Sequence, residues 1–159
     1  MVDAVLVAIA INALMDTRSP EQRSYIMRSV RTRDTGPELA VRSLLHQMGL
    51  RFSLQRKDLP GRPDIVLPKR NTVVFVHGCF WHGHGCRKGR LPKSRLGFWR
   101  PKIRKNKTRD AESAKMLRAQ GWRVLTIWQC QTKNSDRLRN KLVAFFFPAR
   151  AKAQYRTLH

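Results

Sequence analysis

A cluster of metal-binding side chains between His77 and Cys86 places the tightest limit on the fold of this chain. Three histidines and two cysteines lie within these ten residues. Zinc in structural sites takes four nitrogen or sulfur ligands, and Cys79, His84 and Cys86 can reach one ion because the glycines between them let the backbone fold tightly. The fourth ligand must come from elsewhere, and Cys130 is the only other cysteine. We therefore expect a structural zinc site that joins the cluster to a distant segment.

The alternative interpretation of the cluster is a set of reduced core cysteines with surface histidines. The spacing is not a standard zinc-finger pattern, but the close clustering favours zinc. An odd number of cysteines, three in all, argues against a disulfide framework and for a reducing compartment.

The spacing of apolar residues predicts an α/β fold in which helices flank a mixed central sheet. Three short strands follow two helices and read as a meander, and a longer helix separates them from a fourth strand. The expected elements are helices at 20–30 and 35–49, strands at 52–54, 64–67 and 72–76, a helix at 104–120, a strand at 122–128 and a helix capped by Ser135.

The charge of the chain points to a polyanionic partner. Lys and Arg number 33 against 10 acids, which gives a net charge of +23. Nucleic acid rewards each cation placed on a phosphate through counterion release. Residues 87–109 alone hold eleven Lys or Arg and no acid, although such a run can also be a solvated face. No segment has the length of a membrane span, and we expect no membrane partner. A ribosomal or histone-like protein is the alternative that charge alone allows.

Five side chains are candidates for phosphodiester chemistry. Asp64 is the sole acid between Leu59 and Arg109 and opens a short apolar strand. One carboxylate, a backbone carbonyl and waters suffice for Mg²⁺, although Asp64 could merely pair with a neighbouring arginine. The two histidines outside the zinc set, His77 and His82, are suited to general acid–base work, and each alone is more often structural. Two more acids, each at the start of a helix where the macrodipole also favours them, complete the group: Asp110 and Glu38.

Aromatic residues accompany these basic and polar segments. Phe80, Trp81 and Trp99 are expected in loop-like surroundings, where such side chains can wedge between DNA base steps. Burial is the alternative for all three. For Trp122 and Trp128, which alternate on the predicted strand, we expect packing rather than DNA contact.

Taken together, these motifs resemble the very short patch repair (Vsr) DNA mismatch endonucleases of bacteria. The resemblance runs from about Met15 to Phe147 and depends on an ordered set of segments. They are the Met27-Arg28 region, Thr32-Arg33-Asp34-Thr35, Leu59-Pro60-Gly61-Arg62-Pro63-Asp64, His77-Gly78-Cys79-Phe80-Trp81-His82, Phe98-Trp99, Lys105-Asn106 with Asp110, and Gly121-Trp122-Arg123-Val124-Leu125.

The resemblance implies a restriction-endonuclease-like fold of the PD-(D/E)xK superfamily, in which Pro63-Asp64 supplies the PD and His77 stands where a lysine is usual. It implies that Asp64 and the backbone carbonyl of Val76 bind Mg²⁺. His82 would act as acid and base with support from Asp110.

The resemblance further places His77 in the active site, with Glu38 close by. It implies that zinc is held by the same four residues that the cluster suggested, and that three aromatic side chains intercalate beside the mismatch: Phe80, Trp81 and Trp99. Two departures stand out. Val76 replaces a common threonine at a position used through its carbonyl, and Gly83 and Gly85 replace histidines found in some relatives.

The implied substrate is duplex DNA with a T:G mismatch, formed when 5-methylcytosine deaminates and nicked 5′ of the T. A functional link to a cytosine-5 DNA methyltransferase and to repair synthesis follows. We expect a monomer in the bacterial cytoplasm, associated with the nucleoid. Residues 1–14 are expected to be a non-native or disordered extension, 15–148 a single endonuclease domain and 149–159 a basic tail.

Two other functions stay open from the sequence. A non-catalytic, zinc-containing DNA-binding module would explain the charge and the cluster but would leave Asp64, His82 and Asp110 without a task. A nicking endonuclease of the same fold could also recognise another mismatch or sequence context. A zinc-dependent nucleobase deaminase is excluded because its His-x-Glu and Pro-Cys-x-x-Cys motifs are absent.

Overall fold

A computed structural model describes residues 33–54 and 56–148 of the chain, and all of these except Arg33 belong to the unit Asp34–His159. Three expectations lie outside the described residues: the helix at 20–30, the extension at 1–14 and the tail at 149–159. The domain boundaries therefore stay predictions.

One four-stranded sheet lies at the centre of the described part, with strand order β1-β2-β3-β4. The strands are β1 (Ser53–Leu54), β2 (Ile65–Leu67), β3 (Thr72–His77) and β4 (Arg123–Trp128). The β1–β2 and β2–β3 pairs are antiparallel, whereas β4 pairs parallel with β3. A parallel pair needs a long crossover connection, which the helix between β3 and β4 provides. The predicted meander and the mixed sheet are thus confirmed.

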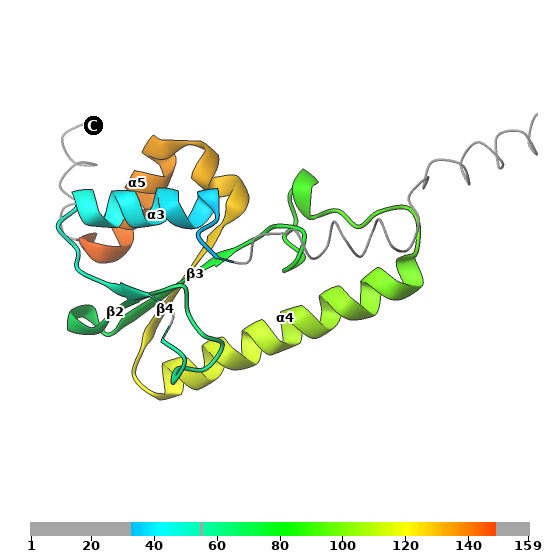
Figure 1. Ribbon diagram of the computed structural model, residues 1–159, viewed down its shortest axis with the longest axis horizontal. Helices are drawn as coiled ribbons and strands as arrows, with labels where there is room; N and C mark the ends of the chain where they lie inside the picture. The colour runs from blue at the N-terminus through cyan, green and yellow to red at the C-terminus, as the bar shows by residue number, and fades with distance from the viewer. Residues whose placement is uncertain (1–32, 55, 149–159) are drawn as a thin grey trace, which may run out of the picture. The chain divides into compact units, whose positions relative to one another are not determined.

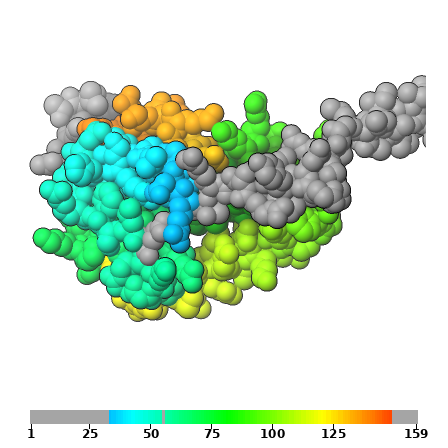
Figure 2. Space-filling model, in the orientation of Figure 1, coloured from blue at the N-terminus to red at the C-terminus, as the bar shows by residue number. Residues whose placement is uncertain are grey.

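Helices cover both faces of this sheet (Figure 1). The helices α3 (Gly36–Gln47) and α5 (Ser135–Phe146) lie on one face, and α4 (Leu96–Ala119) lies on the other. The space-filling view shows α3 and α5, in blue-cyan and orange, on the side away from the yellow-green α4 (Figure 2). A strand with both faces covered needs apolar residues at successive positions, and the β2 and β3 strands have them.

Alternate residues of the strands feed two separate clusters, as the two-residue period of a strand requires. In β3, Val74 belongs to the larger cluster under α3 and α5, whereas Val73 and Phe75 belong to a smaller cluster that includes Leu117 of α4. His77 continues the second series at the end of β3. The parity of the strand therefore turns His77 toward the α4 side.

The helix α4 begins at Leu96, eight residues before the predicted start at Arg104. Pro101 lies inside it, and proline in a helix removes one hydrogen bond. One stripe of residues at three- and four-residue spacing offsets that cost, because it packs along the whole length of the helix. The stripe consists of Trp99, Ile103, Asn106, Asp110, Ser113 and Leu117.

Two smaller boundaries also differ from the prediction. The strand β4 begins at Arg123, so Trp122 precedes it. The cap of α5 is Asn134, whose side-chain oxygen accepts a hydrogen bond from the Arg137 N–H at 2.8 Å, and Ser135 is the first helical residue. Asparagine and serine are equally good caps, so the sequence alone did not separate them. In the described part of the chain, no helix is apolar enough over a sufficient length to cross a bilayer.

Candidate active site and metal centre

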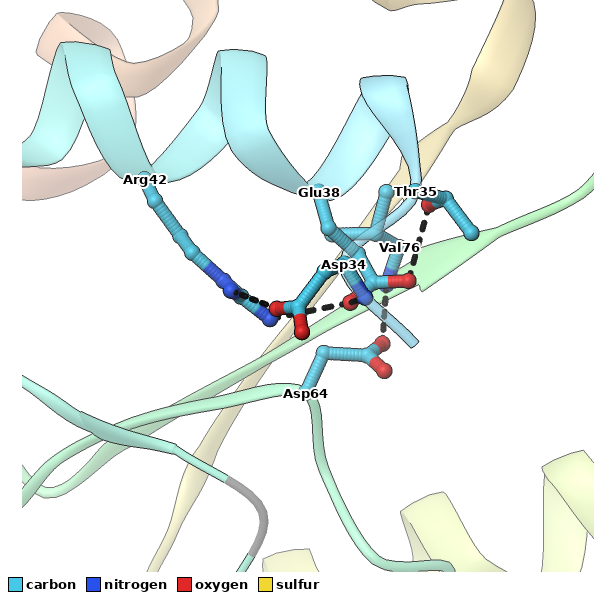
Figure 3. A network of polar contacts seen from close by, with 6 residues as sticks. All are labelled: Asp34, Thr35, Glu38, Arg42, Asp64 and Val76. Atoms are coloured by element: carbon cyan, nitrogen blue, oxygen red, sulfur yellow. Dashed lines mark hydrogen bonds and ion pairs between the residues drawn. The ribbon is translucent and has the colours of Figure 1, made fainter. Parts of the chain in front are cut away.

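Asp64 lies just before β2, where that strand parts from β3. Its Oδ2 atom accepts a hydrogen bond from the Val76 N–H at 2.7 Å (Figure 3). Burial raises the pKa of Asp64 to about 6; the Val76 bond opposes this shift, and the nearby Glu38 adds to it. The carboxyl group is therefore held in place by the backbone of β3, and its negative charge has little solvent to stabilise it.

Glu38, in the first turn of α3, is 5% exposed and accepts three hydrogen bonds (Figure 3). The Thr35 hydroxyl donates to Oε1 at 2.8 Å, while the Asp34 N–H and Arg42 Nη2 donate to Oε2 at 3.2 and 2.9 Å. Arg42 also pairs with Asp34 through Nη1, at 2.5 Å. Glu38 thus ties the residues just before α3 to the first turn of that helix, and it lies close enough to Asp64 to influence the pKa of that carboxyl group.

His82 forms a tight pair with Asp110 of α4, since its Nδ1 lies 2.5 Å from Asp110 Oδ2. A carboxylate on one ring nitrogen fixes the tautomer and leaves the other nitrogen for chemistry. The ring of His77 stacks on that of His82 with centroids 3.8 Å apart and planes 6° apart. Burial, followed by the neighbouring His82, lowers the pKa of His77 to about 4. His77 is consequently a neutral imidazole at physiological pH.

The structure brings all five candidate residues into one region. His82 lies among the other candidates, because it contacts His77 and Asp110 and is close enough to influence the pKa of Asp64. The five come from α3, the start of β2, the end of β3, the loop after β3 and α4: Glu38, Asp64, His77, His82 and Asp110. Their catalytic roles stay predictions, but their predicted proximity does occur.

The four predicted zinc ligands also converge. Their ligand atoms all lie within 4.8 Å of one another: Cys79, His84, Cys86 and Cys130. Cys130 Sγ is 3.5 Å from His84 Nδ1, and the Cys130 N–H donates to Cys79 Sγ at 3.4 Å. Zinc bonds of 2.0–2.3 Å in a tetrahedron place ligand atoms about 3.5 Å apart. Three thiols and one imidazole at these separations fit a structural zinc site.

Hydrogen bonding prepares one of these thiols for metal. The bond from His84 is the largest influence on Cys86 and lowers the pKa of its thiol to about 6, whereas burial raises the pKa of Cys79 to about 11. The 3-10 turn after β4, Gln129–Lys133, carries Cys130 to the cluster. The end of the sheet and the loop after β3 meet there, at the place where the sequence predicts that a zinc ion joins them.

The aromatic candidates form a cluster at the start of α4. Phe80 lies edge-on to Trp81 and Trp99, with centroid distances of 5.1 and 5.0 Å, and the two tryptophans are 6.2 Å apart. The expectation of a loop is wrong for Trp99, which stands on α4. The Asn106 side chain donates to the Trp81 carbonyl at 2.8 Å and fixes the loop to the helix.

Two glycines of the loop after β3, Gly83 and Gly85, differ in their surroundings. Gly83 has φ of +61°, and a Cβ there would lie 2.7 Å from Ile103 Cγ2, whereas a Cβ on Gly85 would meet nothing within 4 Å. The loop therefore approaches α4 so closely at Gly83 that a side chain cannot fit without movement. Both this packing and the positive φ favour glycine at position 83.

Two residues of this region were missed by sequence reasoning. Arg42 holds Glu38 and Asp34, and its spacing of four residues from Glu38 was the available signal. For Trp128, the alternation along the strand predicts packing alone. It is only half-buried and lies against His77 and His84, and its position two residues before Cys130 was the clue.

Comparison with known proteins identifies the family. A family model described as DNA mismatch endonuclease Vsr matches residues 15–88. The chain is 57% identical to the type II nicking enzyme V.XorIIP of Xanthomonas oryzae pv. oryzae over 129 residues, which cover 81% of this chain and 95% of that protein. It is 42% identical to the DNA mismatch endonuclease Vsr of Escherichia coli, over 79% of this chain and 80% of that protein.

A third relative, the type II nicking enzyme V.NmeAIP of Neisseria meningitidis, is 42% identical over 81% of this chain and 92% of its own length. Among solved structures, the catalytic domain of the homing endonuclease I-Bth0305I is similar with a TM-score of 0.48 and 18% identity, over 71% of this chain and 95% of that domain. The predicted fold class is confirmed by the mixed sheet together with the family match. This chain belongs to the Vsr family of DNA mismatch endonucleases and is a DNA endonuclease.

Proposed function

We propose that this endonuclease nicks duplex DNA 5′ of the T in a T:G mismatch, in a reaction that requires Mg²⁺. The observation that carries the proposal is the convergence of Asp64 with the His82–Asp110 pair. Its E. coli relative is named a mismatch endonuclease, and others are named nicking enzymes. DNA cleavage is common to these names, the mismatch appears in the first and single-strand cleavage in the others, and the proposal combines the two.

The metal would be held by Asp64 and the backbone carbonyl of Val76. The N–H and carbonyl of a strand residue point to the same side, and the Val76 N–H already points to Asp64, so its carbonyl faces the same place. Oxygen donors of this kind, completed by water, suit Mg²⁺. A bound Mg²⁺ would supply an activated water and would stabilise charge on the departing oxygen.

The remaining residues would handle protons and position. His82 would transfer a proton through the ring nitrogen that Asp110 leaves free, since the carboxylate holds the other one. Neutral His77 would accept a hydrogen bond at the site and support the His82 ring by stacking. Glu38 would act through its charge near Asp64, because three donors already occupy its oxygens.

The aromatic cluster would recognise the mismatch. Phe80, Trp81 and Trp99 lie together beside a strongly basic helix, and apolar side chains inserted between base steps unstack them for a few kcal/mol. A mismatched step is weaker and therefore costs less to open. Insertion would thus favour mismatched over matched duplexes.

The zinc ion would be structural, held by the three cysteines and His84. We infer that the protein acts as a monomer in the bacterial cytoplasm on DNA of the nucleoid. The source of its substrate would be a cytosine-5 DNA methyltransferase, and its nick would be passed to repair synthesis.

The test uses end-labelled duplexes that differ only at one central pair, T:G against T:A, in several methyltransferase contexts with Mg²⁺. Nicking 5′ of the T, absent without Mg²⁺ and in Asp64→Ala, is the expected result. Mismatch-independent nicking would reject the T:G assignment. Tight binding without cleavage would mean that this chain has become a non-catalytic zinc-containing DNA-binding module.

A second specificity has one observation in its favour. The relative with 57% identity is named a type II nicking enzyme rather than a mismatch endonuclease. The same duplex panel, extended to other mismatches and flanking sequences, separates the two assignments. Preferential cleavage of a duplex other than T:G would favour this second one.

A further inference from the structure

Trp128 occupies the space between the candidate zinc site and the candidate catalytic histidines. It is the last residue of β4 and pairs in register with His77 of β3. Its indole ring stacks on the His84 imidazole, with centroids 4.4 Å apart and planes at 22°. The same indole meets the His77 ring edge-on at 5.5 Å and 70°. One side chain thus contacts a predicted zinc ligand and a predicted active-site residue.

The backbone around Trp128 is held by a fixed set of hydrogen bonds. Its N–H donates to Gln131 Oε1 at 3.0 Å, and the half-buried Lys141 donates to the same oxygen at 2.9 Å. Lys141 also donates to the Thr126 carbonyl of β4 at 3.1 Å. The 3-10 turn that begins after Trp128 and carries Cys130 is therefore fastened to both β4 and α5. A change in the turn would move the indole.

Four rings follow one another from one site to the other: His84, Trp128, His77 and His82. The last ring is hydrogen-bonded to Asp110. Closely packed groups transmit small displacements, because no free space absorbs them. An error of about 1 Å in the position of a reacting group can reduce a rate by about 100-fold.

We propose that Trp128 is a positioning residue that aligns His82 with the scissile phosphate by fixing His77 relative to the zinc site. The inference rests on the proposed function, in which His82 transfers the proton and zinc fills the Cys/His set. In this proposal Trp128 acts through the imidazoles that its ring contacts, and not on the DNA or the metal itself. Without its ring, zinc would still bind, but His77 and His82 would lose their common alignment.

The test compares Trp128→Leu, which removes the ring, with Trp128→Phe, which keeps one. Trp122→Leu is the control, because Trp122 lies before the opposite end of β4 and packs against the smaller cluster. Each full-length variant is assayed for single-turnover nicking at saturating enzyme, for DNA affinity, for zinc content and for the ring NMR signals of its histidines.

Trp128→Leu should reduce the single-turnover rate by about 100-fold, with DNA affinity within about twofold of the wild type and zinc unchanged. Trp128→Phe should recover most of the rate. The His82 ring signals should shift in Trp128→Leu although His82 does not contact the indole, and Trp122→Leu should leave them in place. The proposal is overturned if Trp128→Leu loses zinc, or if Trp122→Leu slows nicking to the same extent. In either case Trp128 would serve only in packing.

A double-mutant cycle with His77→Ala tests whether Trp128 acts on His82 through His77. If Trp128 acts through His77, its removal costs little once the His77 ring is gone; an undiminished loss overturns the proposal. A failure of the proposed function can be distinguished from a failure of the proposal for Trp128. If the wild type nicks no T:G duplex, the rates are measured on whichever duplex it does cut. If it cuts none, the proposed function fails, and the His82 signals alone decide: a shift supports the alignment, and no shift refutes it.

Discussion

Asp64→Asn should stabilise the folded protein at neutral pH while abolishing nicking. Burial raises the pKa of Asp64 from an ordinary value of 3.8 to about 6, so the folded state prefers the neutral side chain. The difference corresponds to about 3 kcal/mol of unfolding free energy lost by the wild type above that pH. Asparagine carries no charge and keeps an oxygen that can accept from the Val76 N–H.

The sign of the pH dependence follows from the same shift. A group whose pKa is higher in the folded state stabilises that state when protonated, and this contribution disappears as the pH rises through about 6. The advantage of Asp64→Asn should therefore be largest above pH 7 and fall by about half at pH 5. The full difference of about 3 kcal/mol would raise the melting temperature by about 6–12 °C for a domain of this length.

Thermal melts of both proteins without added Mg²⁺, from pH 5 to pH 8, are the assay. Adding Mg²⁺ should stabilise the wild type alone, since ligand binding to the folded state adds stability. Asp58→Asn is the matched control, because Asp58 is exposed and its pKa is lowered to about 2 by the hydrogen bond from Arg56. The reasoning is refuted if Asp64→Asn melts below the wild type at pH 8, or if the gap does not narrow on acidification.

Three further outcomes are expected. Asp110→Asn should slow nicking by about 100-fold or more with DNA affinity unchanged in binding assays; an unaltered rate would remove Asp110 from the mechanism. Cys130→Ser should lower both the zinc content and the melting temperature, and full zinc retention would contradict the assignment of the fourth ligand. Gly83→His should destabilise the fold by about 1–3 kcal/mol through its contact with Ile103, whereas Gly85→His should not; equal denaturation midpoints for the two would disprove the packing argument.

The sheet was predictable because its residues obey a strand period and its turns contain glycine and proline. The β2 and β3 segments are apolar on both faces, and their limits in the structure agree with the pattern to within one residue. The start of α4 was not predictable by the same reasoning. Pro101 and a dense run of cations argue for a loop, and only contacts with the rest of the fold, such as that of Phe80 with Trp99, make a helix favourable there.

The site was predictable as a set of residues, and less so as a set of interactions. Residue type and resemblance selected the acids, histidines and cysteines that the structure brings together. They did not indicate that Glu38 is occupied by three hydrogen-bond donors or that Arg42 supplies one of them. Nor did they place Trp128 between two histidines. Such contacts depend on the register between β3 and β4 and on helix packing, which local patterns do not encode.

The stripe of inward-facing residues along α4 also fixes the distance between two of its members. Trp99 and Asp110 are eleven residues apart on it, which is three helical turns and about 16 Å along the axis. The helix therefore holds the loop that carries Phe80, Trp81 and His82 at two points a fixed distance apart, through Trp99 and through Asp110. In the proposed function, the number of residues between Trp99 and Asp110 would set how far the inserted Trp99 side chain lies from the His82–Asp110 pair that transfers the proton.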